Sequence, residues 1–249
     1  MKKINLIFGT HNNQPYGTHS HIFEEAYQKA YKPFLSVLNR FPEISTVLHY
    51  SGSLLEWIEE NHPEFLMLLN DLIKRKQVEL LGGGFYEPIM PILPTTDRIG
   101  QIETMTTYLR KRFGKRPRGI WIAERVWEQS LTYNLKTCGM DYTFLDDQHY
   151  LAAGLRGEMM HQPVITEDQG KAIVVFPISH PLRYMVPFNT PQEVIQYLRN
   201  IDSDKELTIA ILGDGEKYGY WEGTYQRCYE EKWLEELFTL LLENNDWIE

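Results

Sequence analysis

Residues 118–129 read RGIWIAERVWEQ, a short apolar run that leads directly into an acidic residue. The run at 119–123 is typical of a strand that is covered on both faces. Glu124 follows it, and Trp121 and Trp127 stand on either side. A carboxylate at the end of a buried strand has a fixed position, as a reacting group requires, and the aromatic side chains could form a floor for a flat ligand.

The same kind of strand recurs along the chain and alternates with longer helical patterns. The expected strands are residues 4–11, 45–52, 77–84, 119–124, 142–147, 172–179 and 207–216. The expected helices are residues 23–41 with a kink or break at Pro33, 54–76 as two helices, 96–114, 130–139, 190–201 and 229–245. This alternation predicts an α/β protein with parallel strands, arranged either as an open doubly wound sheet or as a closed barrel.

The residues at the strand ends favour the barrel. No GxGxxG or GxxxxGK[ST] motif is present, which argues against the nucleotide-binding open sheets. Polar side chains that could act in catalysis or binding instead stand at or beyond the strand ends: His11, His49, Tyr50, Glu87, Glu124, Asp146, Asp147, Asp214 and Glu216. The expected strand at 77–84 also carries Glu79. In a β/α barrel the carboxyl ends of the strands converge on one face, and that face holds the active site.

Composition narrows the possible partners and the compartment. The chain has 249 residues, a net charge of −9 and no basic block, which argues against a nucleic-acid partner. No run approaches the length of a membrane span, so no membrane association is expected. Cys138 and Cys228 form no CxxC motif, which predicts reduced core thiols and a cytoplasmic location. The 6 Trp, 15 Tyr and 11 Phe suit either a large core or surfaces on which sugars stack.

Glu124 and Asp214 are the best pair of carboxylates, because each follows an apolar strand and neither continues into a charge run. Two carboxylates across one pocket suit glycoside cleavage, at about 5–5.5 Å for retention and about 6.5–9.5 Å for inversion. A single acid at a strand end could instead cap the next helix. Five strands that end in this way weaken the capping interpretation.

Other candidate residues each have a structural alternative. Arg125 could pair with a carboxylate at the site or form an ordinary salt bridge. Trp121, Trp127 and Trp221 could stack on sugar rings or pack in the core, and the Gly-rich EKYGYWEG segment favours a loop position for Trp221. His11 could bind a substrate hydroxyl group or be a satisfied histidine at the rim.

Metal chemistry is the competing interpretation. The possible ligands are Asp146, Asp147, His149, His19 and His21. A divalent ion that activates water there would make the protein a sugar deacetylase. No HxxxH or HExxH pair is present, so the sequence favours a site with no metal and no cofactor.

Four stretches resemble, in order and spacing, motifs of glycoside hydrolase family 57. They are HNNQPYG (11–17), QVELLGGGFYEPI (77–89), WIAERVWE (121–128) and LGDGEKYGYW (212–221). The likeness runs along essentially the whole chain and is greatest to the 4-α-glucanotransferases of the family. It implies a (β/α)7 distorted TIM-like barrel with parallel strands inside and helices outside, which agrees with the seven strands expected above.

The resemblance also implies a function and a set of site residues. The function is that of a retaining 4-α-glucanotransferase or α-amylase, which acts on an α-glucan or malto-oligosaccharide by double displacement without a metal. Glu124 would be the nucleophile and Asp214 the acid/base. The expected substrate-binding residues are His11, Asn13, Glu79, Trp121, Arg125, Glu216 and Trp221.

The sequence departs from the family pattern in two respects. Asn13 replaces the usual second histidine of the first motif, and an amide cannot carry a positive charge. The family's transferases continue with a helical region, which supplies an Asp, and a β-sandwich domain; residues 1–249 are expected to form a single barrel domain without them. These departures leave open a catalytically impaired carbohydrate-binding relative, or a homo-oligomer that completes the site.

Overall fold

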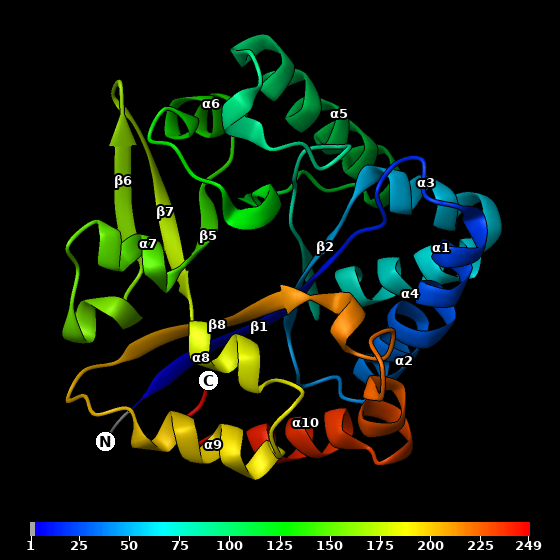
Figure 1. The fold of residues 1–249 in the computed structure, drawn as a ribbon, viewed down its shortest axis with the longest axis vertical. Helices are drawn as coiled ribbons and strands as arrows, with labels where there is room; N and C mark the ends of the chain where they lie inside the picture. The colour runs from blue at the N-terminus through cyan, green and yellow to red at the C-terminus, as the bar shows by residue number, and fades with distance from the viewer. Residues whose placement is uncertain (1–2) are drawn as a thin grey trace.

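The expected apolar strands form one sheet in the computed structural model, which describes residues 3–249 (Figure 1). The strands in that range are β1 (Ile4–Asn12), β2 (Thr46–Tyr50), β3 (Val78–Leu80), β4 (Gly119–Ile120), β5 (Tyr142–Asp146), β6 (Val164–Asp168), β7 (Lys171–Ile178) and β8 (Leu207–Asp214). They follow the order β3-β2-β1-β8-β7-β5-β4, and every pair along this path is parallel. β6 pairs antiparallel with β7, outside this path.

The two ends of the strand order meet at Gly82, so the sheet closes. The Gly82 N–H donates to the Gly119 carbonyl oxygen at 2.8 Å, and the Trp121 N–H donates to the Gly82 carbonyl oxygen at 2.9 Å. Together they form a parallel bridge between Gly82 and Ile120, just beyond β3 and at the end of β4. The seven parallel strands among the described residues therefore form the closed (β/α)7 barrel that the sequence predicts.

Helices surround the barrel on all sides that Figure 1 shows, with α1 to α4 together, α5 beside α6, and α9 beside α10 below the β1–β8 pair. The helices are α1 (Ser20–Ala26), α2 (Lys32–Asn39), α3 (Gly52–Asn61), α4 (Pro63–Lys74), α5 (Thr95–Phe113), α6 (Leu131–Thr137), α7 (Asp147–Ala152), α8 (His180–Met185), α9 (Pro191–Asn200) and α10 (Trp233–Glu243). From residue 3 to residue 249, no helix combines the length and apolar character needed to cross a membrane.

The expected kink at Pro33 is a widened turn of a continuous helix. A π-helical segment, Tyr27–Tyr31, joins α1 to α2, and the Lys32 N–H donates five residues back to the Tyr27 carbonyl oxygen. Proline has no N–H and its ring crowds the preceding turn, and a π-turn relieves both problems. The turn also carries Tyr31, whose hydroxyl group reaches the candidate site described below.

Three elements were not predicted from the sequence: β6, α7 and α8. β6 and the first half of β7 form a hairpin that projects from the barrel (Figure 1), with Gln169 and Gly170 both at positive φ in its two-residue turn. Ile165 on β6 is 75% exposed, so this strand lacks the apolar run of a barrel strand. The helices α7 and α8 have six residues each, too few to show a helical period.

The buried side chains form an outer core under the helices and a separate inner cluster. The inner cluster consists of Leu81, Trp121, Phe144, Ile178, Ala210 and Leu212. Its members come from strands around the sheet, as expected for a filled barrel interior. Cys138 and Cys228 are buried and unpaired, which confirms that they are core residues.

Candidate active site

Strand register brings three of the expected strand-end residues to one level at the mouth of the barrel. His11 on β1 lies opposite His49 on β2 and opposite Asp214 on β8. His49 and Asp214 are at or near the carboxyl ends of their strands, where barrel active sites form. The expected convergence of strand ends is therefore present at these three positions.

The sequence predicted that Glu124 would end a strand over residues 119–124, but the structure places it in a turn. β4 ends at Ile120, and the chain then forms a single 3-10 turn over Ala123–Arg125. Glu124 and Arg125 both have left-handed backbone conformations, with φ of 51° and 55°. Such conformations are costly for non-glycine residues and cluster at functional sites. Here the bend leaves the Glu124 side chain 75% exposed and accessible to a ligand.

The Arg125 guanidinium lies beside Glu124 and is hydrogen-bonded to Asp146. Its guanidinium donates from Nε to the Asp146 carboxylate at 3.0 Å, and its Nη2 lies 3.9 Å from the Glu124 carboxylate. Arg183 donates from Nη1 to the other Asp146 oxygen at 3.3 Å. Arg125 thus lies with Glu124 at the site, and Asp146 orients both Arg125 and Arg183.

Trp121 packs against residues of the site but is not itself exposed to a ligand. Its side chain is completely buried, and the His11 ring is stacked on it with 4.6 Å between centroids and 15° between planes. The Arg125 guanidinium lies over the same ring, at 5.5 Å. Because no face of Trp121 is exposed, the structure replaces the expected stacking on a sugar with a role in positioning His11 and Arg125.

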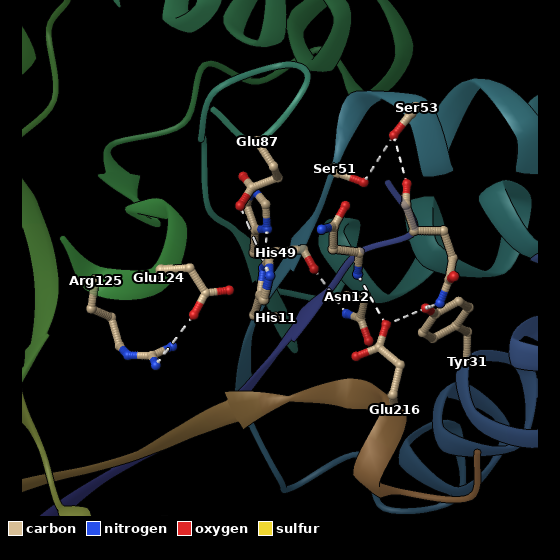
Figure 2. A network of polar contacts seen from close by, with 12 residues as sticks. His11, Asn12, Tyr31, His49, Ser51, Ser53, Glu87, Glu124, Arg125 and Glu216 are labelled. Carbon is tan, nitrogen blue, oxygen red and sulfur yellow. Dashed lines mark hydrogen bonds and ion pairs between the residues drawn. The ribbon is translucent and has the colours of Figure 1, made fainter. Parts of the chain in front are cut away.

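His11, His49 and Glu87 form a buried polar column, which Figure 2 shows beside Glu124 and Arg125. The Nδ1 atoms of His11 and His49 are 2.8 Å apart, and His49 Nε2 lies 3.4 Å from Glu87 Oε1. A Cβ at Gly83 would lie 2.3 Å from His49 Nε2 and 3.1 Å from Glu87 Oε1. Only glycine at this position allows the backbone to approach the column so closely.

Burial keeps the column uncharged at neutral pH. It lowers the pKa of His49 to about 3 and holds the pKa of His11 well below its usual range, with the nearby His49 and Arg125 adding to the shift of His11. Burial, together with the negative charge of Glu124, raises the pKa of Glu87 to about 8. The column can therefore bind hydroxyl groups by hydrogen bonds without adding net charge to the mouth.

Glu216 forms a second network on the other side of the column (Figure 2). Its carboxylate accepts hydrogen bonds from the Tyr31 hydroxyl group and from the Asn13 backbone N–H, the latter at 3.1 Å. Gln14 donates from Nε2 to the Tyr31 oxygen at 3.0 Å. Asn13 makes this contact through its backbone N–H, so the contact does not depend on the side chain at position 13. Glu216 and Asn13, two of the residues expected at the site, thus lie together.

The Glu216 network predicts a stability that depends on pH. Burial raises the pKa of Glu216 to about 7 against hydrogen bonds that lower it, whereas the unfolded chain titrates near 4.5. Between pH 4.5 and pH 7, Glu216 keeps its proton in the folded state but loses it in the unfolded state. The free energy of unfolding therefore falls as pH rises through this range. A Glu216→Gln variant has no such titration, so its free energy of unfolding should rise relative to wild type by up to about 3 kcal/mol between the two pH values.

Urea unfolding at about pH 5 and about pH 8 measures that difference. Glu222→Gln is the matched control, because Glu222 is exposed on the same loop and should show the same difference from wild type at both pH values. A difference between wild type and Glu216→Gln that does not change with pH would show that Glu216 does not titrate in this range.

Asp214 interacts electrostatically with a buried lysine, Lys217, that was not predicted from the sequence. Lys217 is buried and donates from Nζ to the Arg183 carbonyl oxygen at 3.1 Å. Burial lowers the pKa of Lys217 to about 8; the charge of Asp214 opposes this shift and the charge of Arg183 adds to it. The charge of Lys217 therefore interacts favourably with that of Asp214.

The structure does not bring Glu79 to this cluster. Glu79 lies level with Val47 on β2, two residues before His49, and its carboxylate accepts from the hydroxyl group of Tyr142, the first residue of β5, at 2.6 Å. It therefore lies towards the amino-terminal ends of the strands. Trp221 is in the loop after Glu216, as expected, where it is 43% exposed and stacks against Phe188 at 6.1 Å.

The proposed metal ligands do not gather. His19 and His21 stack on each other at an exposed position, and Asp147 accepts from the His180 N–H. His149 Nδ1 lies 3.3 Å from the Asp146 carbonyl oxygen. In the part of the chain that the structure describes, no group of three His, Cys, Asp or Glu side chains is arranged to hold a metal ion.

Sequence reasoning noted Glu87 and His49 at strand ends but did not include them among the site residues. Tyr31, Gln14, Arg183 and Lys217 were not identified at all. Glu87 stands in the GGGFYEP stretch, beside three glycines that permit close backbone approach, and this was the available signal.

The closed barrel, with carboxylates, histidines and aromatic residues at the carboxyl ends of its strands, places the protein among β/α-barrel proteins whose site lies on that face. Comparison with known protein families matches residues 7–249 to glycosyl hydrolase family 57, and the chain belongs to this family. The resemblance read from the four sequence motifs is thereby confirmed.

Individual relatives match almost all of this chain. It is 46% identical over 245 residues to a 4-alpha-glucanotransferase of Thermococcus litoralis, covering 98% of this chain and 37% of the relative. It is 46% identical over 237 residues to an alpha-amylase of Pyrococcus furiosus, covering 95% and 36%. The crystal structure of the Thermococcus litoralis 4-alpha-glucanotransferase superposes with a TM-score of 0.94, covering 97% and 38%. The chain thus spans well under half the length of these relatives.

Proposed function

We propose that this chain carries the catalytic site of a retaining α-1,4-glucan-active enzyme of the 4-α-glucanotransferase or α-amylase type. The observation that carries the proposal is the exposed Glu124 carboxylate, held by a left-handed turn beside Arg125 at the mouth of the barrel. Asp214, at the end of β8, supplies the second carboxylate on the same face. The names of the relatives, which share 46% identity, support a glucan as the substrate.

The reaction follows from the roles of the two carboxylates. Glu124 attacks the anomeric carbon while Asp214 protonates the leaving glycosidic oxygen, so a bond to Glu124 forms as the bond to the leaving sugar breaks. Asp214 then takes a proton from water or from a sugar hydroxyl group, whose oxygen displaces Glu124 with a second inversion. Water gives hydrolysis, and a sugar hydroxyl group gives transfer.

Other residues of the mouth hold these two carboxylates and the sugar. Arg125, fixed by Asp146, keeps positive charge beside Glu124, and the charge of Lys217 interacts favourably with that of Asp214. The uncharged column offers hydrogen bonds to sugar hydroxyl groups through His11, its partly exposed member. Trp221 offers an exposed aromatic face to a sugar ring.

The two alternatives from the sequence have less support. Glu124 and Asp214 are both present on the same face of the barrel, which argues against a binding relative that has lost its catalysis. Both Asp146 oxygens are engaged by arginines, which argues against a deacetylase metal site there. Burial of both cysteines as free thiols supports the cytoplasm as the expected compartment.

Incubation of the purified chain with maltoheptaose, with products separated by length, tests the proposal. We expect products both longer and shorter than the substrate for a transferase, and only shorter products for a hydrolase. A Glu124→Gln variant, run in parallel, should give neither. Binding of maltoheptaose without turnover in the wild-type chain would favour the carbohydrate-binding alternative.

A further inference from the structure

The polar column of His11, His49 and Glu87 has no part in the two-carboxylate mechanism, yet it is closely packed beneath the mouth. His49 is completely buried and the Glu87 side chain is 6% exposed. Among residues 3–249, His49 Nε2 and Glu87 Oε1 lie 3.4 Å apart, and neither atom has any other polar partner. Because a buried polar atom without a hydrogen bond is costly, each of these two atoms is the one available partner of the other.

The contact between the two histidines fixes how protons can be arranged along the column. Their Nδ1 atoms are 2.8 Å apart, so one ring must donate and the other must accept. His11 Nε2, at 3.9 Å from Glu87 Oε2, is too far from that oxygen for a hydrogen bond, and the His11 side chain is 11% exposed. His11 Nε2 is therefore the ring atom of the column that is left to face a ligand.

The state of Glu87 selects between the two arrangements. A protonated Glu87 donates to His49 Nε2, so His49 donates from Nδ1 to His11 Nδ1, and His11 carries its own proton on Nε2. An ionised Glu87 accepts from His49 Nε2–H, so His49 Nδ1 accepts from His11 Nδ1–H, and His11 Nε2 has no proton. In the first arrangement His11 donates to the ligand, and in the second it accepts.

We propose that Glu87 is a positioning residue that acts through His49 to set the tautomer of His11, and thereby decides whether His11 donates to or accepts from a sugar hydroxyl group at the mouth. The sugar in this statement rests on the proposed function, whereas the coupling of the three side chains rests on their geometry alone. The left-handed backbone at Glu87, with φ of 53°, supports a role beyond packing, because such strain gathers at functional sites.

The charges around Glu87 determine which arrangement predominates. The titratable groups that face it are His49 on β2, His11 on β1, and Glu124 on the turn after β4, where Arg125 lies beside His11. Burial and the charge of Glu124 raise the pKa of Glu87 to about 8. At neutral pH Glu87 is protonated, and His11 presents a donor.

Nitrogen-15 NMR of the full chain, labelled at histidine, tests the coupling without any substrate. Long-range proton–nitrogen correlations distinguish the two tautomers of His11 as pH is raised from about 6 to about 9.5. We expect the wild-type His11 proton to move from Nε2 to Nδ1 with a midpoint near 8, the pKa of Glu87. A Glu87→Gln variant should hold one tautomer throughout, because an amide does not ionise in this range. Glu79→Gln, the same change in the same motif but away from the mouth, should titrate as wild type does.

A second variant, Glu124→Gln, tests the direction in which the midpoint moves, and this test does not depend on whether Glu87→Gln folds. Glu124→Gln removes the negative charge that raises the pKa of Glu87, so the midpoint of the His11 transition should move to lower pH. A single His11 tautomer across the range in wild type, or a transition that persists in Glu87→Gln, would overturn the proposal. Since no measurement requires turnover, failure of the proposed glucan activity would be detected separately, with maltoheptaose.

Discussion

Replacing Glu124 by glutamine should lower the rate of the proposed glucan cleavage and transfer by on the order of 10⁴-fold or more, the scale on which loss of a covalent nucleophile acts. The amide has the same shape but cannot form the glycosyl intermediate. The side chain is 75% exposed, so its loss of charge should leave the fold and its stability almost unchanged. Initial rates with maltoheptaose, beside urea unfolding curves, measure the two effects separately.

Glu128→Gln is the matched control for this variant. Glu128 belongs to the same WIAERVWE motif and is exposed, so it shares the local sequence but not the left-handed turn. We expect it to retain nearly full activity. Equal activities for the two variants would show that the reaction does not pass through Glu124.

The number of strands and their convergence could be predicted from the sequence because both follow from local patterns. The apolar runs that became β1, β7 and β8 are long enough to show their type, and His11 and Asp214 at or near the ends of β1 and β8 mark the mouth. The hairpin strand β6 could not be predicted, because it lies outside the barrel and has no apolar run.

The site itself was only partly predictable, and the GGGFYEP motif region shows why. Glu79 and Glu87 stand eight residues apart in one sequence motif, and the family resemblance implied Glu79 as the sugar contact. Closure of the barrel through Gly82 and the left-handed turn at Glu87 place Glu87 against His49 and leave Glu79 beside Tyr142. Both features depend on tertiary packing, which no local pattern records.

The two tryptophans show that the burial of a side chain also depends on tertiary packing. Trp121 and Trp221 were equally plausible as sugar-stacking rings by residue type alone, and only the Gly-rich surroundings of Trp221 favoured a loop. The barrel interior takes up Trp121 completely, and its ring supports His11, whereas Trp221 keeps an exposed face. Residue type predicts that an aromatic is useful, but its depth in the barrel decides how it is used.

Replacing Asp214 by asparagine should lower glucan turnover by about 10²- to 10⁴-fold, the usual contribution of a general acid/base. Its first role is to protonate a leaving sugar oxygen, so the loss should depend on the leaving group. With α-maltosyl fluoride, fluoride departs without protonation, and the first step should proceed at nearly the wild-type rate. Rates with maltoheptaose and with the fluoride, compared for the same variant, measure the acid role directly. Asp202→Asn, at an exposed position, is the control that should affect neither rate.

Added azide distinguishes the roles of the two carboxylates in one further experiment. In Asp214→Asn the intermediate on Glu124 still forms, and azide can resolve it without a base, which gives a glycosyl azide of retained α configuration. In Glu124→Ala the fluoride substrate is attacked directly by azide from the face that the carboxylate has vacated, which gives the β product. The opposite configurations follow from the geometry of double displacement and not from the size of any rate. The same configuration from both variants would contradict the assignment of Glu124 as nucleophile and Asp214 as acid/base.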